Sequence, residues 1–145
     1  MNSTKSRLAL VFAMLMFGLV GTALSVWAHH SFTAEFDIYK PVVIEGTITN
    51  VEWINPHIQI YLDAKDEHGA TGQWKVESWG TGNMHRAGIV KEKLTPGTQV
   101  KMRAYHAKDG TQNFAYLRNL TFLKDGSSYE LWVGGQDGTP VDQRK

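Results

Sequence analysis

The chain has 145 residues, with 15 Lys and Arg, 14 Asp and Glu, six His and no Cys, and a formal net charge of +1 at pH 7. This length holds one domain, alone or behind a targeting segment, and the charge excludes a strongly basic protein that neutralises many phosphates of a nucleic acid. Without cysteine there are no disulfides, thiolate metal sites or cysteine nucleophiles, so any chemistry falls to histidines, carboxylates, aromatic side chains and the backbone.

The first 28 residues have the pattern of a secretory signal peptide. Lys5 and Arg7 precede an uncharged run at 8–24, and the small residues Val26 and Ala28 stand at the −3 and −1 positions of a cleavage site. An uncleaved membrane anchor is the alternative, because the run approaches the roughly 20 residues that span a bilayer. No basic cluster follows the run, which favours cleavage after Ala28 and a nearly neutral, periplasmic mature chain. The expected organisation is a signal peptide at 1–28, an N-terminal extension at 29–40, a folded domain at 41–133 and a flexible tail at 134–145.

Beyond residue 40, short β patterns alternate with turn signals. Alternating apolar and polar residues predict five strands, at 42–53, 58–63, 73–77, 99–105 and 113–123. Gly46 interrupts the first strand, where glycine often marks a bend or bulge. Residues 83–87 predict one or two helical turns that end at Gly88, and Asp109-Gly110 predicts a hairpin between the last two of these strands. An edge strand is expected at 129–133.

Three strands, a short helical segment and two further strands follow one another in the order of the OB-fold, a five-stranded Greek-key barrel. We therefore expect an all-β, OB-fold-like domain. A small antiparallel sandwich is the alternative, which periodicity alone leaves open.

Four sequence blocks resemble a family of small exported bacterial proteins that is known as a domain of unknown function. The blocks are AHHSFTAEFD at 28–37, VEWINPH at 51–57, LTPG at 94–97 and AKDG at 107–110. The resemblance covers nearly the whole mature chain. It implies an exported, single-domain protein and carries no established activity.

Cleavage after Ala28 makes His29 the first residue of the mature chain. Its α-amine and its imidazole can then chelate one metal ion through two nitrogens, and a further imidazole, such as that of His30, completes a nitrogen set that suits Cu(II). The alternative is that His29 and His30 are only a solvated pair at a new terminus. Glu35, Asp37 and Glu52 are candidate hydrogen-bond acceptors that orient such imidazoles, or else ordinary surface carboxylates.

Two further histidines are expected at one end of the barrel. His57 follows Asn55-Pro56 and points away from Ile58, whereas His106 stands beside the Asp109-Gly110 hairpin and shares a parity with the core residues of its strand. A bulge could bring the two together as metal ligands. Otherwise, His57 is a turn histidine and His106 a histidine at the barrel mouth.

The loops that bind ligands in OB-folds also carry aromatic and amide side chains here. Trp53, Asn55 and Trp79 are candidates for a rim that holds a ligand or a partner. Phe32 and Phe36 are expected to fasten the N-terminal extension to the barrel. His68 and His85 are expected to be solvated, although Met84-His85 resembles a soft copper pair.

The sequence contains no nucleophile elbow, zinc-protease helix or phosphate loop. The leading hypothesis is a non-enzymatic periplasmic domain that carries copper through His29 and His30, with His57 and His106 in support. The second is a metal-free module that binds a periplasmic protein or small ligand, and the weakest is a copper-dependent oxidoreductase. Nucleic acid is not expected as a partner, and a membrane only through an uncleaved signal segment.

Overall fold

The computed structural model describes residues 32–131, most of which lie in six β-strands. The strands are β1 (Phe36–Glu52), β2 (Gln59–Asp66), β3 (Thr71–Glu77), β4 (Gln99–Ala107), β5 (Phe114–Phe122) and β6 (Ser128–Glu130). The helical elements are α2 (Phe32–Glu35), α3 (Thr81–Arg86) and a 3₁₀ turn, η2 (Lys91–Lys93). The expected signal peptide, the terminal histidines His29 and His30, and the tail at 134–145 lie outside the described residues.

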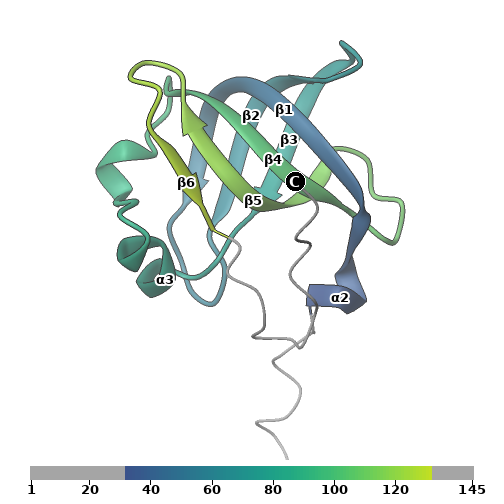
Figure 1. The fold of residues 1–145 in the computed structure, drawn as a ribbon, viewed down its shortest axis with the longest axis horizontal. Helices are drawn as coiled ribbons and strands as arrows, with labels where there is room; N and C mark the ends of the chain where they lie inside the picture. The colour runs from purple at the N-terminus through teal and green to yellow at the C-terminus, as the bar shows by residue number, and fades with distance from the viewer. Residues whose placement is uncertain (1–31, 132–145) are drawn as a thin grey trace, which may run out of the picture. The chain divides into compact units, whose positions relative to one another are not determined.

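Five of the strands join into a closed ring. Hydrogen-bonded neighbours follow the order β3-β2-β1-β4-β5-β6, and an additional parallel pairing places Lys75–Glu77 of β3 beside Phe114–Tyr116 of β5. This pairing closes β1 to β5 into a ring, while β6 lies outside it beside β5 (Figure 1). The all-β, OB-fold-like prediction is therefore confirmed, since an open sandwich would lack the pair that closes the ring.

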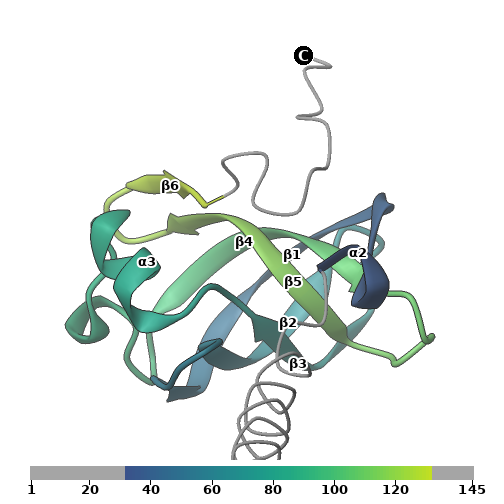
Figure 2. The ribbon, with the colours of Figure 1, turned by 90° about the horizontal axis from the view of Figure 1, so that it is seen from below.

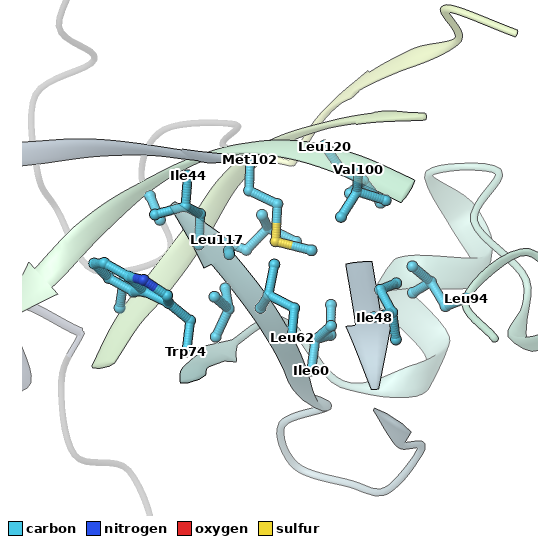
Figure 3. Close-up of a cluster of buried hydrophobic side chains, with 14 of the residues drawn as sticks. Ile44, Ile48, Ile60, Leu62, Trp74, Leu94, Val100, Met102, Leu117 and Leu120 are labelled. Carbon is cyan, nitrogen blue, oxygen red and sulfur yellow. The ribbon is translucent and has the colours of Figure 1, made fainter. Parts of the chain in front are cut away.

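The interior of the ring is filled by apolar side chains from all five strands (Figure 3). Ile44, Ile60, Met102 and Leu120 are fully buried there, and Trp74 is 4% exposed. Each comes from the inward parity of its strand, as alternation along a strand requires. Truncating one fully buried aliphatic side chain of this kind costs about 2–5 kcal/mol, so the core is the main source of stability in a chain without disulfides.

The first strand differs from the prediction in two ways. β1 begins at Phe36 rather than at 42, because Phe36 pairs with Ala107 before a register shift leads to the regular pairing that starts at Pro41. Gly46 marks no bulge: the irregularity in the pairing of β1 with β2 lies between Ile48 and Asn50. A Cβ on Gly46 would stand 2.2 Å from a backbone oxygen of β2. The glycine is needed because the two strands approach too closely for any side chain.

The helix α3 ends as the sequence predicts, at a glycine in the left-handed region. Gly88 has φ of +84°, and its N–H donates to the carbonyl of His85 at 3.0 Å. The N–H of Ile89 donates to the carbonyl of Met84 at 3.0 Å, which completes a Schellman motif. Met84 and Ile89 are both fully buried, so this turn fastens the segment between β3 and β4 to the core. Figure 2 shows α2 and α3 on opposite sides of the ring.

Between residues 32 and 131, no helix has the length and apolar character needed to span a membrane.

Candidate functional site

His57 lies in the loop between β1 and β2 and contacts a carboxylate of β3. Its Nδ1 pairs with Oε1 of Glu77, and the His57 side chain is 42% exposed whereas that of Glu77 is 10% exposed. The other carboxylate oxygen of Glu77 accepts a hydrogen bond of 3.1 Å from Nε2 of Gln59. Within the described residues, Nε2 of His57 has no hydrogen-bond partner. One ring nitrogen of His57 is thus held by a nearly buried carboxylate, and the other is open.

A second apolar cluster covers the outer side of the ring next to this pair. Tyr105 and Tyr116 face outward from β4 and β5, opposite to the inward residues on either side of them, and both are 6% exposed. Phe36 packs with them, and its ring centroid lies 5.2 Å from that of Tyr116. Phe32 of α2 adds ring contacts at 4.9 Å with Tyr116 and 6.0 Å with Tyr105. The expected fastening of the N-terminal extension through Phe32 and Phe36 is therefore confirmed.

This aromatic cluster links the N-terminal segment to His57. The imidazole of His57 meets the ring of Tyr116 edge-on, with centroids 6.3 Å apart. Tyr116 thus contacts Phe32 on one side and His57 on the other. A backbone hydrogen bond of 2.8 Å, from the N–H of Lys108 to the carbonyl of Glu35, also holds α2 to the chain after β4. The start of the described chain is therefore fixed beside the His57–Glu77 pair.

His106 belongs to a different environment. It pairs with Ala115 in the sheet, and its ring lies 5.8 Å from that of Trp74, a member of the interior cluster. The pairing of β4 with β5 shifts register between Arg103 and Ala104, before His106 is reached. His106 therefore faces inward while His57 contacts residues of the outer face, so these histidines are not brought together by the described strands.

Asn55 has a structural role in the loop between β1 and β2. Its Oδ1 accepts hydrogen bonds of 3.0 Å from both the backbone N–H and the hydroxyl of Thr81, at the start of α3. The neighbouring Gly80 offers no side-chain cap, and a Cβ there would stand 2.4 Å from the carbonyl oxygen of Pro56. The Asn55 side chain thus supplies the cap that α3 lacks and ties the two loops together.

The tryptophans expected at the rim are partly buried. Trp53 packs against the interior cluster, and Trp79 packs against both the interior and the outer cluster. The carbonyl of Trp79 also accepts a hydrogen bond of 3.3 Å from the N–H of Ile58. Ile54, beside Trp53, is 52% exposed and is the large apolar side chain that this loop presents to solvent.

The remaining candidates are engaged elsewhere or exposed. Asp37 pairs with Lys40 and accepts a hydrogen bond from the N–H of Tyr39. Burial, together with the charge and hydrogen bond of Glu52, raises the pKa of Tyr61. His68 and His85 are exposed, as expected.

The soft pair Met84-His85 does not form a site within the described structure. Met84 is fully buried, and its sulfur accepts a hydrogen bond of 3.0 Å from the hydroxyl of Ser78. His85, the next residue, lies on the exposed side of α3.

Glu77, Gln59 and Tyr116 were not singled out from the sequence. Glu77 alternates with Trp74 and Val76 and therefore resembled an ordinary exposed strand residue. It is buried because β3 pairs with β5 at this point and brings Tyr116 beside it. The available signal was the parity of His57, Gln59 and Glu77, which puts all three on the outward side of a β2–β3 pair.

Across residues 32–131, no three His, Asp or Glu side chains are grouped so as to hold a metal ion. His57 with Glu77 is the nearest approach to such a centre that involves an expected ligand. His29 and His30, the primary candidates, lie outside this range.

Comparison with known proteins identifies the sequence family. A family model described as a family of unknown function, DUF6152, matches residues 16–115. No curated protein and no solved structure matches the chain. The match includes His29 and His30, β1 to β4 and the loop that carries His57. The chain therefore belongs to DUF6152, a family of unknown function.

Proposed function

We propose that the protein is an exported, non-enzymatic domain that carries or buffers copper in the periplasm. Cleavage after Ala28 would give a mature chain in which the α-amine and imidazole of His29 chelate the ion. His30 and the open Nε2 of His57 would supply further imidazole nitrogens. A nitrogen-rich set of this kind favours Cu(II), which binds most tightly among the divalent first-row ions.

The observation that carries the proposal is the shared contact of Phe32 and His57 with Tyr116. His30 and His29 precede Phe32 by two and three residues, and an extended chain covers at most about 3.6 Å per residue. We take the anchored position of Phe32 as support for His29 and His30 acting together with His57. An unanchored terminus would have to lose far more conformational entropy to present the same ligands.

The chemistry of His57 also fits a metal ligand. A histidine that binds a metal through one nitrogen usually donates from its other nitrogen to a carboxylate or carbonyl, which fixes the ring and raises its basicity. His57 has this arrangement through Glu77. The contact of His106 with Trp74 inside the ring gives it no comparable opening, so we leave His106 out of the proposed ligand set.

The second candidate is a metal-free module that binds a periplasmic protein or small ligand. One observation favours it: Ile54, beside the expected rim residues Trp53 and Asn55, is 52% exposed. Retention of a partner after removal of all metal, and its loss on Ile54→Ser substitution, would support this candidate over the copper carrier.

Copper affinity of single-histidine variants tests the proposal. The mature protein, secreted with its own terminus, is titrated with Cu(II) against a competing chelator and examined by electron paramagnetic resonance. We expect His57→Ala to weaken binding and to reduce the nitrogen hyperfine structure. His106→Ala and His68→Ala serve as matched controls and should change neither. Equal affinity in the wild type and His57→Ala would remove His57 from the site and with it the structural support for the proposal.

A further inference from the structure

We infer that Glu77 is a positioning residue that holds His57 as its Nδ1–H tautomer and thereby presents the lone pair of Nε2 outward. The inference deepens the proposed function and rests on it for its consequence in copper binding. The effect of Glu77 on the tautomer of His57 does not require a metal and can be tested in the metal-free protein.

Gln59 and His57 surround the carboxylate of Glu77. Gln59 turns its Nε2, which is a donor, toward Oε2 of Glu77 at 3.1 Å, while its own Oε1 is buried and has no hydrogen-bond partner within the described structure. The reverse amide orientation would set the Gln59 oxygen against the carboxylate. Gln59 therefore donates its amide N–H to Glu77 even though its own amide oxygen is left without a hydrogen bond. This orientation indicates that the carboxylate of Glu77 acts as an acceptor here.

The same logic applies to His57. Oε1 of Glu77 contacts Nδ1 of His57, and an acceptor oxygen is satisfied only by a nitrogen that carries a proton. Nδ1 therefore carries the proton, and in the neutral ring Nε2 carries the lone pair. Free histidine prefers the opposite tautomer, so Glu77 reverses the ordinary preference.

Burial and packing restrict the orientation of the His57 and Glu77 side chains. The Glu77 side chain is 10% exposed, Tyr116 lies opposite Glu77 in the sheet, and the rings of His57 and Tyr116 form a T-shaped pair with an interplanar angle of 87°. The ring of His57 is thus restricted by its ion pair with Glu77 and by its ring contact with Tyr116. An imidazole with a fixed tautomer and orientation loses less entropy when Nε2 binds a metal ion.

Nitrogen-15 chemical shifts of the imidazoles in the metal-free mature protein test the inference. The spectra are recorded at about pH 8.5, roughly two units above the usual pKa of a free histidine. We expect His57 to show the Nδ1–H pattern and His68 and His85, which are exposed, to show the Nε2–H pattern in the same spectrum. Glu77→Ala should return His57 to the Nε2–H pattern, whereas Glu92→Gln, which removes a distant exposed carboxylate, should leave it unchanged.

The consequence for metal binding is measured on the same variants. Loss of a carboxylate that orients a ligating histidine weakens metal affinity by about 10–100-fold, and we expect Glu77→Ala to weaken Cu(II) binding within that range. A circular dichroism melt identifies any variant that fails to fold, and Glu77→Asp, which keeps a carboxylate, should recover part of the tautomer signal.

The two possible failures are distinguishable. If His57 of the wild type shows the Nε2–H pattern, the positioning role of Glu77 is wrong even if copper binds. If the tautomer depends on Glu77 but the wild type does not bind copper tightly, the positioning role holds and the proposed function is wrong.

Discussion

The contact between the N-terminal segment and the ring makes a quantitative prediction for Phe32→Ala. Phe32 is half-buried and has ring contacts with Phe36, Tyr105 and Tyr116 at 5.7, 6.0 and 4.9 Å. Truncating a fully buried phenylalanine costs about 3–5 kcal/mol, so a half-buried one should contribute about 2 kcal/mol. In this molecule that free energy holds α2 against the outer face of the ring.

The free energy that Phe32 contributes also sets the expected change in Cu(II) affinity. Since 1.4 kcal/mol corresponds to a factor of ten, detachment of the segment in Phe32→Ala should weaken Cu(II) binding by up to about thirtyfold. Chelator competition measures that affinity. Hydrogen exchange of the Lys108 amide, which donates to the carbonyl of Glu35, reports independently whether the segment has detached.

Tyr39→Ala is the matched control, because Tyr39 is also an aromatic residue near the start of β1 but is 79% exposed. It should change neither the exchange rate nor the affinity. The reasoning would be refuted by a Phe32→Ala variant whose Lys108 amide exchanges much faster while its copper affinity equals that of the wild type.

Three further predictions concern the fold. Gly46→Ala should lower the thermal midpoint by an amount equivalent to about 3 kcal/mol or more, because the new Cβ would stand 2.2 Å from a backbone oxygen. Gly82→Ala in α3 is the control. It should be neutral or stabilising, because its Cβ would meet only a side-chain atom at 3.9 Å. Asn55→Ala should cost about 1 kcal/mol in chemical denaturation, as the loss of a helix cap does. The hydrogen bond from Lys93 lowers the pKa of Tyr129, so Lys93→Met should move that phenol's absorbance titration upward, toward pH 10.

Each of these predictions has a result that contradicts it. A wild-type midpoint in the Gly46 variant would mean that β1 and β2 are not as close as described, and an unchanged denaturation curve for the Asn55 variant would mean that α3 needs no cap. For Tyr129, the lowered folded-state pKa means that the phenolate adds stability above about pH 10, which is lost as the pH falls through the folded-state pKa. An unshifted titration after removal of Lys93 would show that the contact does not persist in solution.

Local patterns in the sequence predicted most of the fold. The alternation of Ile58, Ile60 and Leu62 identified the inward face of β2, and Gly88 identified the end of α3, because both signals lie within a few residues. The start of β1 was misplaced because Phe36 is paired by Ala107, a residue distant in sequence. Strand pairing of this kind leaves no local signal.

The site was predicted less completely, for the same reason. The outward parity of His57 and the inward parity of His106 were visible in the sequence and agree with their contacts to Tyr116 and Trp74. The role of Glu77 was not visible, because it depends on the parallel pairing of β3 with β5, which buries the end of β3. The hydrogen bond of Asn55 with Thr81 was not visible either, because only the folded loops bring these two residues near each other.

The central claim is that the mature terminus itself is part of a copper site, and the chemistry of the α-amine offers the most direct test. Mass spectrometry first establishes that the exported protein begins at His29. Cu(II) binding is then compared between this protein, its His29→Ala variant and a form whose α-amine has been acetylated. We predict one tightly bound ion with nitrogen hyperfine structure in the first protein, and loss of that complex in the other two. Equal binding by the acetylated form would contradict the account, because its blocked amine can no longer chelate together with the imidazole of His29.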